Sequence, residues 1–258
     1  MIIKVYSILE KETSYGRNRM HDVVFIPGAG LLETSGWPLI ALDEPTLHQV
    51  GYWRGFNGHG RKDPKKYVLE HYAEWAWENL FTLIRRIDRP VDIYAHSMGF
   101  PLSLAMLKIA DTVAPGSIRY IIGITPGVYH GEPKRNFHLT FEYAWSLMFP
   151  SSEMIKRTAA AIREIEKRIP HFKYQVTEYP QAMREAGDGV IHLADEFDVT
   201  RYRVYYAKDD LIIPADVTEH AAARADIRCI PIVDGYGHLV PLLDTTGKIL
   251  ELIRADNR

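Results

Sequence analysis

The feature that most constrains the fold of this chain is an alternation of short apolar runs with longer helical patterns between Asp22 and Cys229. The runs are rich in β-branched residues and are bounded by charged residues, glycine or proline, so each run predicts a strand. Because they are apolar almost throughout, they suit strands buried on both faces of a parallel sheet. The sequence therefore predicts an α/β fold with a mostly parallel central sheet of about seven strands and helices on both faces. The predicted strands are residues 2–8, 23–26, 50–53, 91–95, 118–124, 203–206 and 227–232.

Helical patterns fill the intervals between these runs. Residues 66–87 carry apolar side chains mostly three or four positions apart, for example Tyr72 and Trp75, which is typical of a helix with one buried stripe. Three further helices are predicted at residues 98–110, 216–225 and 245–255. Together these elements predict an α/β core formed by residues 1–124 and 201–258.

Residues 125–200 interrupt the alternation. They contain no convincing strand but have two helical patterns, so we predict a helical cap inserted into the core. The first pattern repeats an aromatic side chain at every fourth position: Phe137, Phe141, Trp145 and Phe149. That spacing places the rings along one face of a helix. The rings either line a substrate pocket or pack the cap onto the core, and Phe141 and Trp145 are the pocket candidates.

Composition and charge exclude several classes of protein. The 258 residues include 31 Lys and Arg against 33 Asp and Glu, a formal charge of -2, so no strong positive field draws nucleic acid to the whole molecule. The single cysteine, Cys229, leaves no internal disulfide. The histidines are scattered without the paired spacing of metal ligands, so no metal site is predicted.

The sequence predicts no transmembrane segment. Its longest stretch free of Asp, Glu, Lys and Arg is residues 93–107, which has 15 residues and falls short of the ~20 that a bilayer-spanning helix needs. Residues 1–11 contain an apolar run with Lys4 and Glu10, without the basic leader and long apolar centre of a secretory signal. We therefore expect a cytoplasmic protein.

A serine stands at the junction between a predicted strand and a predicted helix. Ala95, His96, Ser97, Met98 and Gly99 form a small-x-Ser-x-small sequence directly after an apolar run. A tight turn of this kind holds the serine in strained geometry that only small neighbours permit, and its hydroxyl projects above the sheet toward the helix N-terminus. An ordinary helix cap is the alternative, but the strand before and the helix after favour a nucleophile. We expect His96 to neighbour the site without taking part in the reaction.

A serine hydroxyl is nearly inert at neutral pH, so it needs a base within hydrogen-bond reach and an acid that orients the base. His238 lies on a glycine-flanked loop after the last predicted strand, which makes it the best placed of the 11 histidines. Asp209 and Asp210 follow the preceding predicted strand, and either carboxylate could orient the imidazole. With an unperturbed pKa of ~6.5, a histidine base predicts activity that rises as the ring loses its proton.

The chain order Ser97, Asp210, His238 resembles the α/β-hydrolase family, in which nucleophile, acid and histidine follow in this order. The resemblance extends from about residue 22 to the C-terminus. The family's acid commonly stands in a stretch like Gly-x-x-Asp-x-x-Val-Pro, which aligns with residues 207–214. That register implies Asp210 as the acid and leaves Asp209 as a solvated carboxylate in a turn.

Two glycine-containing segments extend the resemblance. Residues 27–30 (Pro-Gly-Ala-Gly) resemble the family's His-Gly-x-Gly oxyanion loop, and residues 58–61 resemble its structural Gly-His-Gly-Arg turn. The resemblance implies that the backbone N–H groups of Ala29 and Met98 bind a developing oxyanion. It also places Gly30 at the substrate pocket.

Four residues depart from the family pattern. Pro27 replaces the usual histidine of the oxyanion loop, and Lys62 replaces the serine that follows Gly-His-Gly-Arg. Ala95 stands where glycine is most frequent, and Phe100 occupies another position where glycine is common. None of these changes removes a reacting group.

The resemblance implies a serine hydrolase that cleaves a carboxylic ester or thioester through an acyl-enzyme on Ser97, without a cofactor. The expected partner is a small-molecule substrate, an apolar acyl or aryl ester. The same scaffold and triad also serve carbon–carbon bond hydrolysis, amide hydrolysis, perhydrolysis and cyanohydrin lysis, so the triad does not fix the reaction. A ligand-binding or receptor protein on this scaffold is the remaining alternative, although all three triad positions are filled.

Overall fold

The structure of the protein is a computed structural model. It describes residues 22–28, 37–43, 45–50, 69–97, 99–127, 199–210, 213–232 and 235–257 of the chain. The predicted strand at residues 2–8 and most of the predicted cap, residues 128–198, lie outside the described residues, and so do Phe141 and Trp145. The cap and its pocket candidates therefore stay predictions.

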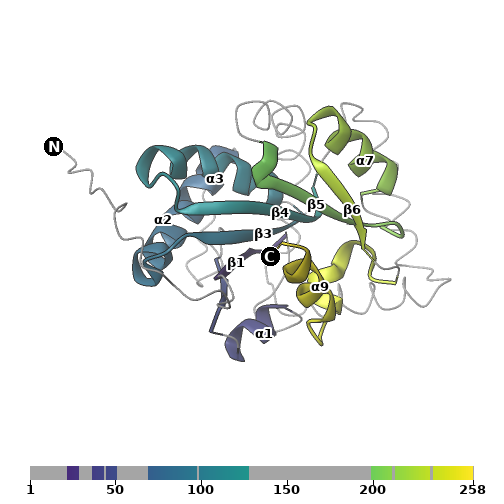
Figure 1. The fold of residues 1–258 in the computed structure, drawn as a ribbon, viewed down its shortest axis with the longest axis horizontal. Coiled ribbons are helices and arrows are strands. Elements are labelled where there is room, and N and C mark those ends of the chain that lie inside the picture. Colours follow the sequence, from purple (N-terminus) through teal and green to yellow (C-terminus); the bar gives the residue numbers. More distant parts are fainter. Residues whose placement is uncertain are drawn as a thin grey trace, which may run out of the picture.

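In the described residues, six parallel strands form one sheet in the order β2-β1-β3-β4-β5-β6 (Figure 1). The strands are β1 (Val23–Ile26), β2 (Leu47–Gln49), β3 (Val91–Ser97), β4 (Ile118–Pro126), β5 (Tyr202–Ala207) and β6 (Arg228–Ile232). β2 pairs with one edge of β1 and β3 with the other, so the strand order reverses at β1. In open α/β sheets, the carboxyl ends of the strands at such a reversal border the ligand-binding crevice. The predicted α/β fold class is confirmed.

Helices cover both faces of this sheet (Figure 1). They are α1 (Trp37–Asp43), α2 (Leu69–Ile87), α3 (Gly99–Val113), α7 (Ala215–Arg224), α8 (Val240–Leu243) and α9 (Lys248–Asp256), with short 3-10 turns η1 (Val199–Arg201) and η2 (Gly237–Leu239). One apolar cluster joins α2, α3 and α7 to one face of the sheet, and a second joins α1, α8 and α9 to the other. Val24 and Ile26 belong to the first cluster, whereas Val23 and Phe25 belong to the second, which explains why the strand is apolar throughout. None of the described helices is both long enough and apolar enough to cross a membrane.

The sequence prediction and the structure differ at β2 and α1. Of the predicted strand at residues 50–53, only residue 50 is described, and it lies outside a strand, whereas residues 51–53 lie outside the described residues. The structure has a strand that was not predicted, β2, at Leu47–Gln49. This strand carries half-buried polar side chains such as His48, so it lacks the continuous apolar character that marks the other strands. α1 has only seven residues, too few to display a helical repeat in the sequence. It is fixed by a tertiary contact, a 2.9 Å hydrogen bond from the indole Nε1 of Trp37 to Asp244.

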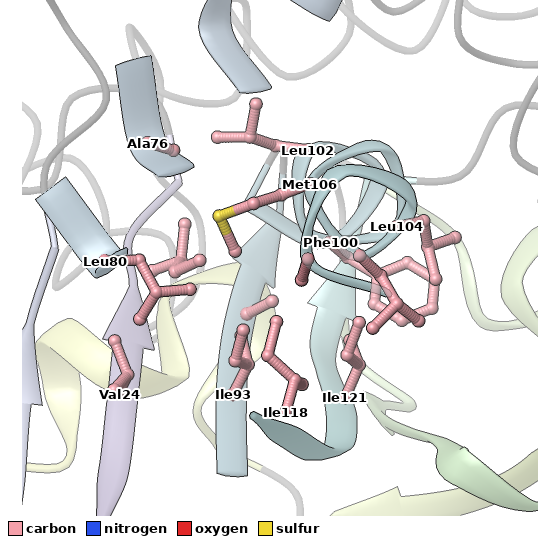
Figure 2. Packing of buried hydrophobic residues seen from close by; sticks show 14 of the residues in the cluster. Val24, Ala76, Leu80, Ile93, Phe100, Leu102, Leu104, Met106, Ile118 and Ile121 are labelled. Carbon is pink, nitrogen blue, oxygen red and sulfur yellow. The ribbon is translucent and has the colours of Figure 1, made fainter. Parts of the chain in front are cut away.

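The core between the sheet and the two helices α2 and α3 shows how Phe100 is accommodated after the serine turn. Figure 2 shows Met106 of α3 reaching toward Leu80 of α2 while Phe100 lies over the sheet. Phe100 is buried against Gly123 of β4, where an added Cβ atom would lie 2.7 Å from Cδ2 of the Phe100 ring. Because Gly123 has no side chain, β4 leaves room for the aromatic ring of Phe100. In the family that the sequence resembles, glycine is common at the position of Phe100.

Gly123→Ala should lower the free energy of unfolding by about 1 to 3 kcal/mol, because the added methyl group overlaps the Phe100 ring in a close-packed core. In a Phe100→Leu background the same substitution should destabilise less, since the smaller side chain leaves room for the methyl group. Urea unfolding of the wild type, both single variants and the double variant measures the two effects. Equal destabilisation in both backgrounds would show that Phe100 does not require Gly123.

Candidate active site

Ser97 ends β3 in a strained turn that leads into α3. Its φ angle is 51°, in the left-handed region that residues other than glycine rarely adopt. Gly99, the first residue of α3, lies so close to the end of β1 that an added Cβ atom would be 2.5 Å from the carbonyl oxygen of Ile26. This close approach explains the glycine of the small-x-Ser-x-small sequence. A strained serine between a strand and a helix is the geometry of a nucleophile elbow.

His238 and Asp210 form a hydrogen-bonded chain with Ser97. Nε2 of His238 lies 2.8 Å from Oγ of Ser97, and Nδ1 lies 2.8 Å from Oδ2 of Asp210. Oδ1 of Asp210 accepts the backbone N–H of Ile213 at 2.9 Å, which leaves Oδ2 directed at the ring. Ser97, Asp210 and His238 are only 3%, 6% and 7% exposed. The structure thus brings together the three residues that the sequence analysis selected.

The end of β1 borders the same serine. Gly28 is buried, and an added Cβ atom there would lie 2.7 Å from the Cβ atom of Ser97. The segment that resembles an oxyanion loop therefore starts beside the candidate nucleophile. Ala29, Gly30 and Met98 lie outside the described residues, so Ala29 and Met98 stay predicted oxyanion donors and Gly30 a predicted pocket residue.

The family of the chain follows from a direct comparison with known families. The model of a family described as "Alpha/beta hydrolase family" matches residues 23–251. The chain belongs to the alpha/beta hydrolase family. This membership supports a hydrolase activity. No curated protein sequence matches the chain.

Several solved structures share this fold. A lipase-esterase related protein from Clostridium acetobutylicum is 13% identical, with a TM-score of 0.63 and coverage of 93% of this chain and 96% of that chain. A thermophilic esterase from Thermogutta terrifontis is 15% identical, with a TM-score of 0.55 and coverage of 92% and 89%. A thioesterase from the prodiginine biosynthetic pathway in Streptomyces coelicolor is 12% identical, with a TM-score of 0.55 and coverage of 92% and 90%. At these identities the likeness shows the fold alone.

Asp209 precedes the candidate acid Asp210 in sequence. It binds the backbone of the loop that carries His238, called here the histidine loop. Its half-buried carboxylate accepts the backbone N–H groups of Gly235 at 2.8 Å and Gly237 at 3.2 Å. The φ angles of these residues are 101° and 52°, which favours glycine at both positions. Asp209 is thus not simply a solvated carboxylate in a turn. The glycines on either side of Tyr236 are the sequence signal that pointed to this loop.

His96 is buried between the end of β1 and the histidine loop. Its Nδ1 accepts the backbone N–H of Gly28 at 3.3 Å, so Nε2 carries the hydrogen and donates it to the carbonyl oxygen of His238 at 2.7 Å. Burial, together with the electrostatic influence of the neighbouring His238 ring, lowers the pKa of His96 to about 3. The ring is therefore neutral at pH 7. The sequence analysis placed His96 beside the site but gave no signal for either contact, because both partners are distant in sequence.

The described residues offer no candidate metal centre. No group of three or more His, Cys, Asp or Glu side chains among them could hold a metal ion. The acidic and imidazole groups of the site instead hydrogen-bond to one another, to Ser97 and to the backbone.

His96 should make the folded state less stable as the solution is acidified. Its pKa is about 6.5 in an unfolded chain and about 3 in the folded protein, so between these values the unfolded chain binds more protons. The stabilisation is complete above about pH 6.5 and is lost progressively as the pH falls toward about 3. His96→Gln removes this titration, so its free energy of unfolding should fall less steeply over this range, by up to ~1.4 kcal/mol per pH unit.

Urea unfolding of both proteins at a series of pH values measures the two slopes. All other titrating groups are shared, so the difference between the slopes reports position 96. Identical slopes would contradict a neutral, buried His96 in the folded protein.

Proposed function

We propose that this alpha/beta hydrolase cleaves a carboxylic ester or thioester through an acyl-enzyme on Ser97. The observation that carries the proposal is the continuous chain of hydrogen bonds from Asp210 through His238 to Ser97, with both distances at 2.8 Å. A nucleophile, a base and a group that orients the base within hydrogen-bond reach form the arrangement that activates a serine hydroxyl.

In the first step, Nε2 of His238 takes the proton of Ser97 while Oγ attacks the carbonyl carbon of the substrate. The negative charge that develops on the carbonyl oxygen is stabilised by the predicted backbone donors of Ala29 and Met98. His238, now protonated, gives the proton to the leaving group. This is the oxygen of the departing alcohol for an ester, or the sulfur of the departing thiol for a thioester. The acyl group is then bound to Ser97.

In the second step, His238 takes a proton from a water molecule that attacks the acyl-enzyme. Collapse of the second tetrahedral intermediate returns the proton to Ser97 and releases the carboxylic acid. In both steps Asp210 fixes the tautomer of His238 and stabilises its protonated form. The N–H of Ile213 keeps the carboxylate of Asp210 in the orientation that this role requires.

The names of fold neighbours support an ester or thioester as the substrate class. They include a lipase-esterase related protein, an esterase and a thioesterase. The proposed substrate is a small molecule with an apolar acyl or aryl group, bound near Gly30 and under a cap that carries Phe141 and Trp145. We propose that the reaction needs no cofactor and takes place in the cytoplasm.

The proposal predicts that Ser97→Ala loses the cleavage of p-nitrophenyl esters, by about 10⁴-fold or more in kcat, because the proposed acyl-enzyme cannot form without the Ser97 hydroxyl. Ser103→Ala is the matched control. Ser103 is also a buried serine, but its hydroxyl bonds the carbonyl of Gly99 inside α3, so this variant should keep turnover within a few-fold of the wild type. A chain-length series of esters then gives the size of the acyl pocket.

Two results would count against an acyl-enzyme on Ser97. A folded Ser97→Ala variant that cleaves esters at the wild-type rate would remove Ser97 as the nucleophile. A wild-type protein that binds and is stabilised by ester analogues without turnover would favour the ligand-binding alternative. Activity confined to amide or carbon–carbon substrates would keep the mechanism and change the substrate class.

A further inference from the structure

The backbone carbonyl of His238 accepts two hydrogen bonds from buried side chains. Nε2 of His96 donates one at 2.7 Å, and Oγ1 of Thr125 donates the other at 2.9 Å. The donors stand on the neighbouring strands β3 and β4 and are separated from His238 by 142 and 113 residues in sequence. His96 and Thr125 are each 1% exposed, so both donors are shielded from bulk water.

The direction of both bonds follows from their chemistry. A carbonyl oxygen can only accept, so the hydroxyl of Thr125 must donate its hydrogen to it. Because the N–H of Gly28 occupies Nδ1 of His96, the ring hydrogen lies on Nε2 and points at the same oxygen. Both lone pairs of the His238 carbonyl are thus used.

The backbone of β4 is distorted where it presents Thr125. His96 pairs with Ile124 and Ser97 with Pro126, so Thr125 is an extra residue in β4, as in a β-bulge. Its φ angle is 41°, in the left-handed region that a β-branched residue rarely adopts. Strain of this kind persists where the surrounding contacts enforce it, and it is concentrated at functional sites.

The loop that carries His238 needs such contacts because its ring must stay within reach of two partners. The short turn η2, at Gly237–Leu239, places Nε2 at Ser97 and Nδ1 at Asp210. The carboxylate of Asp209 accepts hydrogen bonds from two backbone N–H groups of this loop. His96 and Thr125 donate hydrogen bonds to the backbone carbonyl of His238 in the same loop. The loop is therefore fixed on both sides by side chains outside the hydrogen-bonded chain of Ser97, His238 and Asp210. The His96 ring also packs against the His238 ring, with the ring centroids 5.1 Å apart.

We propose that His96 and Thr125 are positioning residues for the acyl transfer: their hydrogen bonds to the His238 carbonyl fix the imidazole at proton-transfer distance from Ser97. His96 also binds Gly28, so one ring sets the distance between the base and the strand end that leads into the predicted oxyanion loop. This inference rests on the proposed serine-hydrolase function. A loss of alignment of about 1 Å can slow an enzymatic step by about 100-fold, so small shifts of His238 matter.

Thr125→Val tests the inference with little change in shape. Valine is β-branched like threonine and has the same number of heavy atoms, but it cannot donate a hydrogen bond. We expect kcat for p-nitrophenyl ester cleavage to fall about 10- to 100-fold while KM changes by less than about 3-fold, because proton transfer and not substrate binding is impaired. Thr125→Ser keeps the hydroxyl and should restore most of kcat.

Position 96 allows the two bonds of the histidine to be tested separately. In His96→Gln the side chain is long enough for its amide to donate a hydrogen bond to the His238 carbonyl. In His96→Asn the shorter side chain can bond only the backbone N–H of Gly28. We expect Gln to keep more kcat than Asn. Combining His96→Asn with Thr125→Val should lower kcat further than either change, since the carbonyl then lacks both donors.

Thermal unfolding of each variant separates positioning from folding. A Thr125→Val variant with a lower Tm but wild-type kcat would overturn the inference, because the hydroxyl would then matter for stability only. So would equal kcat values for Thr125→Val and Thr125→Ser. If Ser97→Ala keeps its activity, the proposed function fails and the inference fails with it; if only Ser97→Ala loses activity, the inference alone is wrong.

Discussion

The parallel pairing of β3, β4, β5 and β6 is the constraint on which the site depends. Parallel strands end at one edge of the sheet, so Ser97 at the end of β3 meets His238 beyond β6 although 141 residues separate them. Asp210 follows β5 at the same edge, and Thr125 stands near the end of β4. A shift in the register of any of these strands would separate the hydrogen-bonded groups, because each bond tolerates only a few tenths of an ångström.

Close approaches between backbone segments then bring the strand ends within reach of one another. Gly28 lies against Ser97, and Gly99 lies against the end of β1, so the turn that leads from β3 into α3 is packed against the end of β1. His96 joins these strands to the histidine loop and stays neutral because it is buried. The site is therefore supported mainly by residues that do not react, and their contacts determine where the reacting groups lie.

Much of the fold and the three central residues could be predicted because each belongs to a local pattern. Ser97 lies between an apolar run and a helix, and His238 follows two glycines on a loop after a strand. The local pattern left Asp209 and Asp210 open as the acid, and the register of the resembling family selected Asp210. The contacts of Asp209 and Thr125 could not be predicted, since they join segments 26 and 113 residues apart through the folded backbone. The sequence did not predict β2 for a related reason. Its polar side chains are stabilised by tertiary partners, for example His48 by Asp22.

The most direct test of the account is to treat the protein with a fluorophosphonate and to locate the adduct by mass spectrometry of its peptides. This reagent phosphonylates a serine only where a neighbouring base activates it, so it reports the Ser97–His238 contact without knowledge of the natural substrate. The account predicts a single phosphonyl group on Ser97, and no adduct in Ser97→Ala. An unmodified wild-type protein, or an adduct on another residue, would contradict it.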